Sequence, residues 1–120
     1  MKKLGVLLFT VLFGLVALAG CAKTTVDIGI VLPTKDEPRW IQDEERFVAA
    51  LADTDYSVEI LFSQGSTATE LSNVETLISK GIKVLIITAQ DGDAAGAAVE
   101  KAKAEGITVI AYERLITNTD

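Results

Sequence analysis

Four short runs of branched apolar residues alternate with segments of helical periodicity along this chain. The runs lie at residues 26–32, 57–62, 84–88 and 108–112. Strands joined through helices pair in parallel, because each helical crossover returns the chain to the same end of the sheet. The sequence therefore predicts the order βαβαβαβ and the α/β fold class, with helices on both faces of a doubly wound parallel sheet. The run at 84–88 is apolar until its end, which indicates an interior strand.

The first helix is predicted over residues 38–52, because Pro38 suits a first helical position, where no amide hydrogen is required. Five apolar residues at helical spacing are expected to form its apolar side: Trp40, Ile41, Phe47, Val48 and Leu51. Three acidic residues are expected to face water: Asp43, Glu44 and Glu45.

The second helix is predicted to begin with a capping box, in which the side chains of Thr67 and Glu70 bond to free backbone amides of the first turn. Gly81 is expected to end this helix. An alanine-rich third helix follows the loop at residues 89–93 and is expected to end near Glu105.

The N-terminal residues are predicted to be a targeting signal. Lys2 and Lys3 precede an apolar stretch at residues 4–19, which is short for a membrane span. The stretch ends in Leu18-Ala19-Gly20-Cys21, which resembles a bacterial lipobox and contains the one cysteine of the chain. The resemblance implies cleavage before Cys21 and lipid on its sulfur and amine. A secretory signal with an incidental cysteine and an uncleaved anchor are the alternatives.

Three regions are expected on this basis: a lipoprotein signal peptide at residues 1–20, a lipidated tether at residues 21–25, and a domain at residues 26–120. The protein is therefore expected outside the cytoplasm, anchored through Cys21 to the outer face of the cell membrane.

The charge balance argues against nucleic acid as a partner. The chain carries a net charge of −6, and the part after the signal, without the two lysines at its start, carries −8. Phosphate backbones require a basic face. There is no histidine, which removes the commonest general base and metal ligand, and no glycine-rich phosphate loop or nucleophile elbow follows a predicted strand. No catalytic residue, cofactor or metal is predicted.

Two acidic patterns in the chain do not predict a calcium site or a phosphorylation site. Asp91-Gly92-Asp93 resembles the start of a calcium loop, but alanines stand where further oxygen ligands would be required, at Ala95 and Ala102. Carboxylates at strand ends would also suit a phospho-acceptor receiver domain, which works in the cytoplasm, whereas the N-terminal segment predicts export.

Polar and aromatic residues follow three of the four predicted strands. They are Arg39 and Trp40 after the first strand, Gln90 and Asp91 after the third, and Glu113 and Arg114 after the fourth. Parallel strands bring these loops to one edge of the sheet, where open α/β sheets bind ligands. Guanidinium groups donate to hydroxyl oxygens, carboxylates accept from hydroxyls, and an indole can cover the C–H face of a pyranose. The set predicts a site for a polyhydroxylated ligand.

Two of these features are also compatible with a purely structural role. The helical spacing of the apolar residues is equally compatible with Trp40 as a core residue of an amphipathic helix. Glu113 and Arg114 could likewise form an exposed ion pair with no binding role.

Several segments resemble one bacterial family. They are Ile28-Gly29-Ile30 with Leu32-Pro33-Thr34-Lys35, then Arg39-Trp40-Ile41-x-Asp43, the segment at residues 81–87, and Ile110-Ala111-Tyr112-Glu113-Arg114-Leu115-Ile116. Together they are similar to the sugar-binding lipoproteins and periplasmic proteins of ABC importers, in the branch that binds xylose or multiple sugars such as glucose and galactose. The resemblance covers nearly all of residues 26–120.

The resemblance implies a type I periplasmic-binding-protein fold, in which two α/β lobes close on a sugar and residues 26–120 form most of the first lobe. The implied sugar contacts are Arg39, Trp40, Glu113 and Arg114, with Lys35, Gln90 and Asp91 as secondary contacts. The family usually has aspartate where this chain has Glu113. The extra methylene moves the carboxylate by about 1.5 Å, so either the sugar is smaller or Arg114 pairs with Glu113.

The expected function is capture of a monosaccharide of the xylose, glucose or galactose type and its transfer, unaltered, to a membrane permease with a cytoplasmic ATPase. An extracytoplasmic sugar sensor for a histidine kinase or chemoreceptor is the alternative. An enzyme is a third hypothesis, and it would require a general base with a partner that the residues do not reveal.

Overall fold

The computed structural model describes residues 25–120. The predicted signal peptide at residues 1–20 and the predicted lipidation site at Cys21 lie outside the described residues. Seven elements follow one another along the described chain: β1 (Ile28–Leu32), α1 (Pro38–Leu51), β2 (Val58–Phe62), α2 (Thr67–Ser79), β3 (Val84–Ile87), α3 (Ala95–Ala104) and β4 (Thr108–Ala111).

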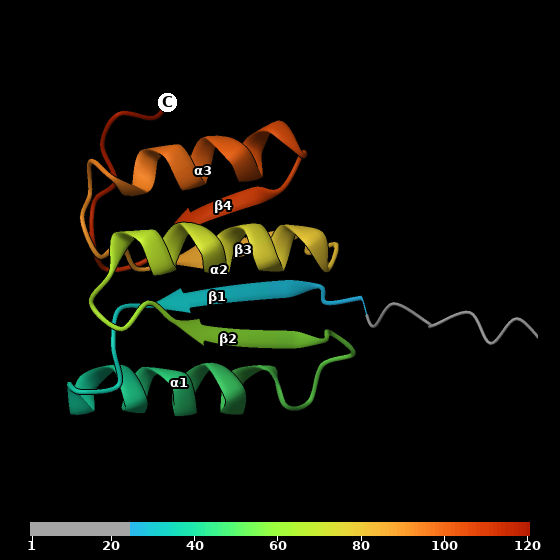
Figure 1. Ribbon diagram of the computed structural model, residues 1–120. Helices are drawn as coiled ribbons and strands as arrows, with labels where there is room; N and C mark the ends of the chain where they lie inside the picture. Colours follow the sequence, from blue (N-terminus) through green and yellow to red (C-terminus); the bar gives the residue numbers. More distant parts are fainter. Residues whose placement is uncertain (1–24) are drawn as a thin grey trace, which may run out of the picture.

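The four strands form one parallel sheet in the order β2-β1-β3-β4, as Figure 1 shows. The predicted βαβαβαβ order, the parallel pairing and the interior position of β3 are confirmed. All four strands point the same way, so the loops that follow them meet at the carboxyl edge of the sheet (Figure 1).

The main core lies between the sheet and the helices α2 and α3. Alternate residues of the interior strands point into it, because successive strand side chains face opposite sides of a sheet. The buried residues of this core come from both layers: Val31, Leu85 and Ile87 from the strands, Val74 and Leu77 from α2, and Ala98, Val99 and Ala102 from α3. The small side chains of α3 let its backbone pack closely on the neighbouring elements.

Helix α1 covers the other face of the sheet near β2. Its Trp40 is 1% exposed, and the ring of Phe47 meets that of Tyr112 edge-on, with centroids 5.2 Å apart. The predicted burial of Ile41 and Val48 is wrong, since they are 38% and 57% exposed. The fully buried side chains of α1 are those of Trp40 and Asp43, so the buried stripe is narrower than the sequence pattern indicated.

The acidic triplet of α1 does not lie wholly in water as predicted. Asp43 is 3% exposed and accepts a hydrogen bond from Arg46 at 2.9 Å, whereas Glu44 is half-buried and Glu45 is exposed. Asp43 lies three residues after Trp40, so it falls on the same buried side of the helix.

The start of α2 also differs from the prediction. Ser66 is the N-cap, with an extended backbone, and its hydroxyl accepts from the amide of Thr69 at 3.2 Å. Thr67 is therefore the first helical residue, and Glu70 points inward at 1% exposure instead of completing a capping box. Gly81 ends the helix as predicted, with φ +82, a backbone conformation that glycine adopts without steric cost.

The segment after β4 runs back across the N-terminal end of α3 (Figure 1). The amide of Thr117 donates to the carbonyl of Gly92 at 3.0 Å. A Cβ atom placed on Gly96 would lie 2.9 Å from the carbonyl oxygen of Thr117 and 3.1 Å from that of Asn118. Glycine at position 96 therefore permits the close approach of this segment.

None of the helices between residues 25 and 120 has the length and hydropathy that crossing a bilayer requires. The same part of the chain holds no group of three or more His, Cys, Asp or Glu residues placed to share a metal ion.

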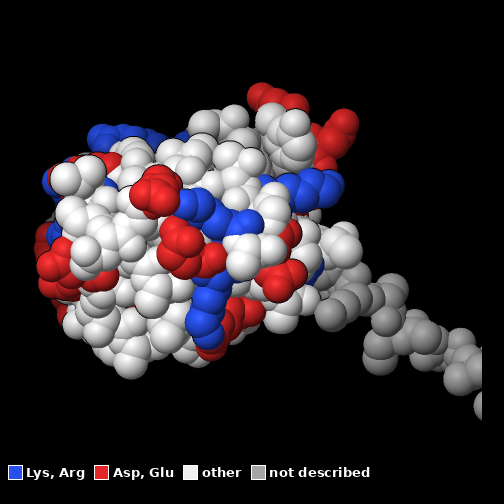
Figure 2. Space-filling model, turned by 90° about the horizontal axis from the view of Figure 1, so that it is seen from above, with Lys and Arg blue, Asp and Glu red and all other residues white. Residues whose placement is uncertain are grey.

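Figure 2 shows acidic and basic side chains interspersed on one face of the molecule. Two ion pairs lie on α2 and α3: Lys101 pairs with Glu75, and Lys103 pairs with Glu100.

The amino edge of the sheet is held by Asp27. Its carboxylate accepts from Lys83 Nζ at 2.7 Å and from the hydroxyl and amide of Ser57 at 2.8 and 3.0 Å. These bonds, that of Lys83 first, lower the pKa of Asp27 from 3.8 to about 2. A lowered pKa in the folded state means that the carboxylate stabilises the fold above its unfolded pKa, and that this contribution disappears as the pH falls through about 2.

We expect Asp27→Asn to destabilise the chain at pH 7, because a neutral amide is a weaker acceptor for Lys83. Urea unfolding followed by circular dichroism should show a lower midpoint for the variant at pH 7 and a much smaller difference near pH 2. Asp55→Asn, at an exposed position before β2, is the control. An equal deficit at both pH values would contradict the role of the carboxylate charge.

We expect Gly96→Ala to displace the segment after β4. The added methyl overlaps backbone atoms, at a cost of about 1–3 kcal/mol, whereas the gain in helix propensity is only about 1 kcal/mol. Hydrogen exchange at the amide of Thr117 should become faster than in the unmodified chain, because its bond to Gly92 is lost. Ala97→Ser, at the next and exposed position, should leave that exchange rate unchanged.

Candidate functional site

Residues from two distant loops meet at the carboxyl edge of the sheet. Arg39 and Trp40 belong to the first turn of α1, which follows β1, and Glu113 and Arg114 follow β4. The site therefore extends across the end of β3, which separates β1 from β4 in the sheet. The juxtaposition that the sequence predicted for these four residues is present in the structure.

The four residues form a contact cluster of alternating charge around an indole. Arg39 Nη2 lies 3.0 Å from Glu113 Oε1, and Arg114 Nε lies 3.6 Å from Glu113 Oε2. The guanidinium carbons of Arg39 and Arg114 lie 4.6 and 5.1 Å from the centre of the Trp40 ring. Both cations are thus held by one carboxylate and by the ring of one tryptophan. We call Arg39, Trp40, Glu113 and Arg114 the arginine–tryptophan cluster.

Exposure differs sharply within the cluster. The side chain of Arg39 is 52% exposed, whereas Trp40 is 1% exposed. The ring of Trp40 therefore has no open face in this structure, and the two guanidinium groups lie over it. The groups that meet solvent at the edge of the sheet are the charged ends of the cluster.

The backbone at Glu113 has φ +65, in the left-handed region. A residue with a Cβ atom enters this region at a cost of roughly 1–2 kcal/mol, and aspartate and asparagine occur there more often than glutamate. From this position the carboxylate of Glu113 contacts both Arg39 and Arg114. Strained backbone of this kind gathers at functional sites.

A second layer lies beneath the cluster. Arg114 Nη1 donates to the carbonyl oxygen of Ala89 at 2.9 Å, and the amide of Gln90 donates to Glu70 Oε2 at 2.7 Å. Burial raises the pKa of the Glu70 carboxyl, while the amide of Gln90 and the charge of Arg114 oppose that change. The loop after β3 is thus fastened to α2 on one side and to Arg114 on the other.

Two of the predicted secondary contacts, Lys35 and Asp91, pair with residues outside the cluster. Lys35 Nζ lies 3.7 Å from Glu44 and 4.6 Å from the centre of the Phe62 ring. Asp91 is exposed, and its Oδ1 accepts from the amides of Asp93 and Ala94 at 3.1 and 2.9 Å, which fixes the turn before α3.

Several buried polar atoms near the same edge have no hydrogen-bond partner among the described residues. They are Trp40 Nε1, Asp43 Oδ2, Ser63 Oγ, Thr88 Oγ1 and Gln90 Oε1. Four of the five residues lie within the loops or the first helical turn that follow β1, β2 and β3; Asp43 lies one turn further into α1. Buried polar groups normally have hydrogen-bond partners, so these atoms could still pair with further donors and acceptors at this edge.

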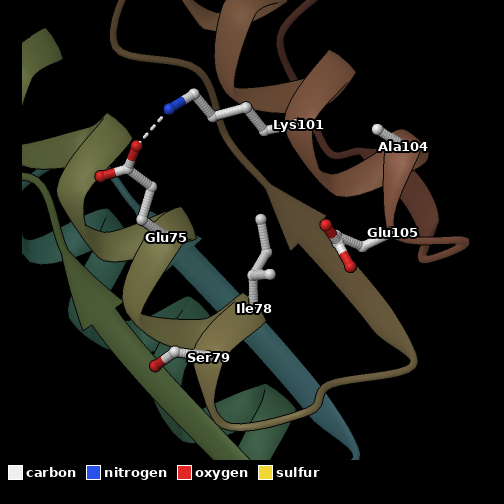
Figure 3. A pocket seen from close by; sticks show the side chains of 6 residues that line it. All are labelled: Glu75, Ile78, Ser79, Lys101, Ala104 and Glu105. Carbon is white, nitrogen blue, oxygen red and sulfur yellow. Dashed lines mark hydrogen bonds and ion pairs between the residues drawn. The ribbon is translucent and has the colours of Figure 1, made fainter.

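A pocket elsewhere on the molecule does not involve these residues. It lies between the C-terminal halves of α2 and α3, where Lys101 pairs with Glu75 across an opening lined by Ile78, Ser79, Ala104 and Glu105 (Figure 3). Helix C-termini lie at the amino edge of a parallel sheet, so the pocket is at the opposite end from the arginine–tryptophan cluster.

The burial of two acidic residues, Asp43 and Glu70, was not predicted from the sequence. Glu70, Val74 and Leu77 recur at helical spacing, and so do Trp40, Asp43 and Phe47. In both helices, the helical spacing of the acidic residue with buried apolar residues indicates that its side chain faces the core. General rules for acidic residues instead favour a capping role for Glu70 and exposure to water for Asp43.

Residues 28–120 match the model of a protein family described as the periplasmic binding protein domain. The multiple sugar-binding periplasmic receptor ChvE of Rhizobium radiobacter is 40% identical over 92 residues, which are 77% of this chain and 26% of that protein. The D-xylose-binding periplasmic protein of Escherichia coli is 33% identical over 95 residues, which are 79% of this chain and 29% of that protein. The chain thus spans less than a third of the length of these relatives.

Solved structures of solute-binding proteins are also similar to this chain. A carbohydrate transporter solute-binding protein from Chloroflexus aurantiacus, in complex with D-glucose, is 66% identical with a TM-score of 0.75, over 80% of this chain and 28% of that one. An ABC transporter solute-binding protein from Clostridium phytofermentans with bound β-D-glucose is 41% identical with a TM-score of 0.74, over 78% and 29%. The predicted type I periplasmic-binding-protein fold is confirmed, and the chain belongs to the periplasmic binding protein domain family.

Proposed function

We propose that this chain is part of the sugar-binding subunit of a carbohydrate ABC importer, in which it supplies most of one lobe of the binding cleft. The observation that carries the proposal is the arginine–tryptophan cluster at the carboxyl edge of a parallel sheet, where such sheets bind ligands. The similarity to glucose-bound proteins supports a monosaccharide as the ligand.

The chemistry of the cluster suits hydroxyl groups. Arg39 and Arg114 present several N–H donors in fixed planes, and Glu113 presents carboxylate oxygens that accept from hydroxyls. A hydrogen bond that involves a charged partner contributes about 1.5–3 kcal/mol. Because Glu113 already pairs with Arg39 at 3.0 Å, a sugar hydroxyl would have to join or replace this ion pair.

Trp40 has a conditional role in this proposal. Its indole can stack on the sugar only after one guanidinium group moves from the ring, since the ring is covered in this structure. Until then both guanidinium groups lie against the indole ring. Lys35, Gln90 and Asp91 are proposed as secondary contacts at the margin of the site.

The identity of the sugar depends on Glu113. The side chain is longer than the aspartate that is usual in the resembled family, and it is already engaged by Arg39 and Arg114. We propose a hexose or pentose of the glucose, galactose or xylose type. The 66% identity to a glucose-bound protein favours glucose as the first ligand to test.

Export, lipid anchoring at Cys21, and association with a permease and an ATPase complete the proposal. The similarity to periplasmic proteins supports a location outside the cytoplasm. Ligand transfer without chemistry is proposed, because the similar proteins are named for sugar binding.

A sensor is the second candidate. A fructose-binding periplasmic domain of a hybrid two-component system is 27% identical with a TM-score of 0.68. This identity is far below the 66% to a transporter protein, so transport is preferred.

We expect the chain alone to show no micromolar sugar affinity, because the cluster contacts a ligand from one side only. A chimaera should restore binding, with this chain replacing the matching segment of the Chloroflexus aurantiacus protein. Calorimetric titration with glucose, galactose and xylose compares the two. Micromolar binding by the chain alone would refute the one-sided site, and a correctly folded chimaera that binds none of the sugars would refute the proposed function.

In the chimaera we expect Arg39→Ala to weaken glucose binding by about 1.5–3 kcal/mol, through loss of a charge-assisted hydrogen bond. Lys101→Ala, at the pocket of Figure 3, is the matched control and should leave the dissociation constant unchanged. An unchanged dissociation constant for Arg39→Ala would place that residue outside the sugar site.

A further inference from the structure

Glu70 is a buried carboxylate that the proposed function does not use directly. It is 1% exposed, it lies in the first part of α2, and its Oε2 accepts from the amide of Gln90 at 2.7 Å. The loop after β3 thereby reaches an anion inside the protein. A carboxylate near a helix N-terminus is favoured by the helix dipole, which accounts for its charge but not for the bond to the loop.

The opposite side of the same peptide unit is occupied by a cation. The amide hydrogen of Gln90 points to Glu70, and the carbonyl oxygen of Ala89, in the same peptide, accepts from Arg114 Nη1 at 2.9 Å. An anion at the N–H end and a cation at the C=O end polarise a peptide in the same direction. Each charged group therefore strengthens the hydrogen bond made by the other.

We propose that Glu70 is a positioning residue, which holds the guanidinium group of Arg114 in the sugar site through the peptide unit between Ala89 and Gln90. Its importance for sugar affinity rests on the proposed function, whereas its effect on Arg114 does not. Because Arg114 lies 5.1 Å from the Trp40 ring, its placement is reported by that ring.

The first test uses this chain without sugar and follows the emission of Trp40, the one tryptophan in the sequence. Glu70→Gln keeps the shape of the side chain and removes its charge. We expect a red shift, in the same direction as that of Arg114→Gln and smaller, because a loosened guanidinium exposes the ring to water. Glu75→Gln, the same change at an exposed position of α2, should give no shift.

A double-mutant cycle separates positioning from a general loss of stability. If Glu70 acts through Arg114, Glu70→Gln should cause no further shift in an Arg114→Gln background. Additive shifts would overturn the proposal. Circular dichroism and urea unfolding identify a variant that has failed to fold. Glu70→Asp, which keeps the charge but withdraws the carboxylate by about 1.5 Å from the amide of Gln90, is then measured in its place and is expected to cause a red shift that is likewise absent in the Arg114→Gln background.

A pH profile gives a second readout that packing alone would not change. The charged side chains that act on the Glu70 carboxylate are those of Arg114 and Asp91. Since burial raises the pKa of Glu70, the group should take up its proton at a higher pH than an ordinary glutamate, and the wild-type emission should then approach that of Glu70→Gln. A transition that persists unchanged in Glu70→Gln would overturn the proposal.

The second test measures glucose affinity in the chimaera. Glu70→Gln should weaken binding by roughly tenfold, equivalent to about 1.4 kcal/mol, and should have little effect once Arg114 is replaced. One outcome is that the chimaera without substitutions binds no sugar while the emission shifts of Glu70→Gln and Arg114→Gln are non-additive. In that case the proposed function fails and the positioning of Arg114 by Glu70 stands. If the chimaera binds sugar and the emission shifts are additive, the positioning role fails and the proposed function stands.

Discussion

The parallel hydrogen bonding of β1 to β3 is the constraint on which the rest of the structure depends. Ile28 pairs with Val84 and Val31 with Ile87, so the two interior strands end side by side and their following loops share one edge. The register also sends Val31, Leu85 and Ile87 into the core with α2 and α3. A single ladder thus sets both the burial that stabilises the domain and the place where polar loop residues meet.

Most of the fold could be predicted because it depends on features repeated along the chain. The apolar runs, Pro38 and Gly81 mark strand and helix boundaries through local physics, and the alternation of elements then limits the pairing to a parallel sheet. The contacts of individual helices were less predictable. The exposure of Ile41 and Val48 follows from how much of α1 touches the sheet, which local periodicity does not encode.

For the site, the sequence indicated which residues meet but not how they are arranged. Arg39, Trp40, Glu113 and Arg114 were all expected at the carboxyl edge, because they follow parallel strands. The covering of the Trp40 ring by two guanidinium groups depends on side-chain rotamers and on the left-handed backbone at Glu113. The bond from Gln90 to Glu70 joins residues 20 positions apart, so no short motif contains it.

The clamp that Asp27 makes with Ser57 and Lys83 lies at the amino edge of the sheet, whereas the arginine–tryptophan cluster lies at the carboxyl edge. Substitutions at sites far apart and without shared partners usually have independent energetic effects. Substitutions at the amino edge and at the arginine–tryptophan cluster should therefore act independently of each other. The amino edge could therefore be optimised for heat resistance, or used to attach a surface or a fluorophore, without altering the contacts among Arg39, Trp40, Glu113 and Arg114.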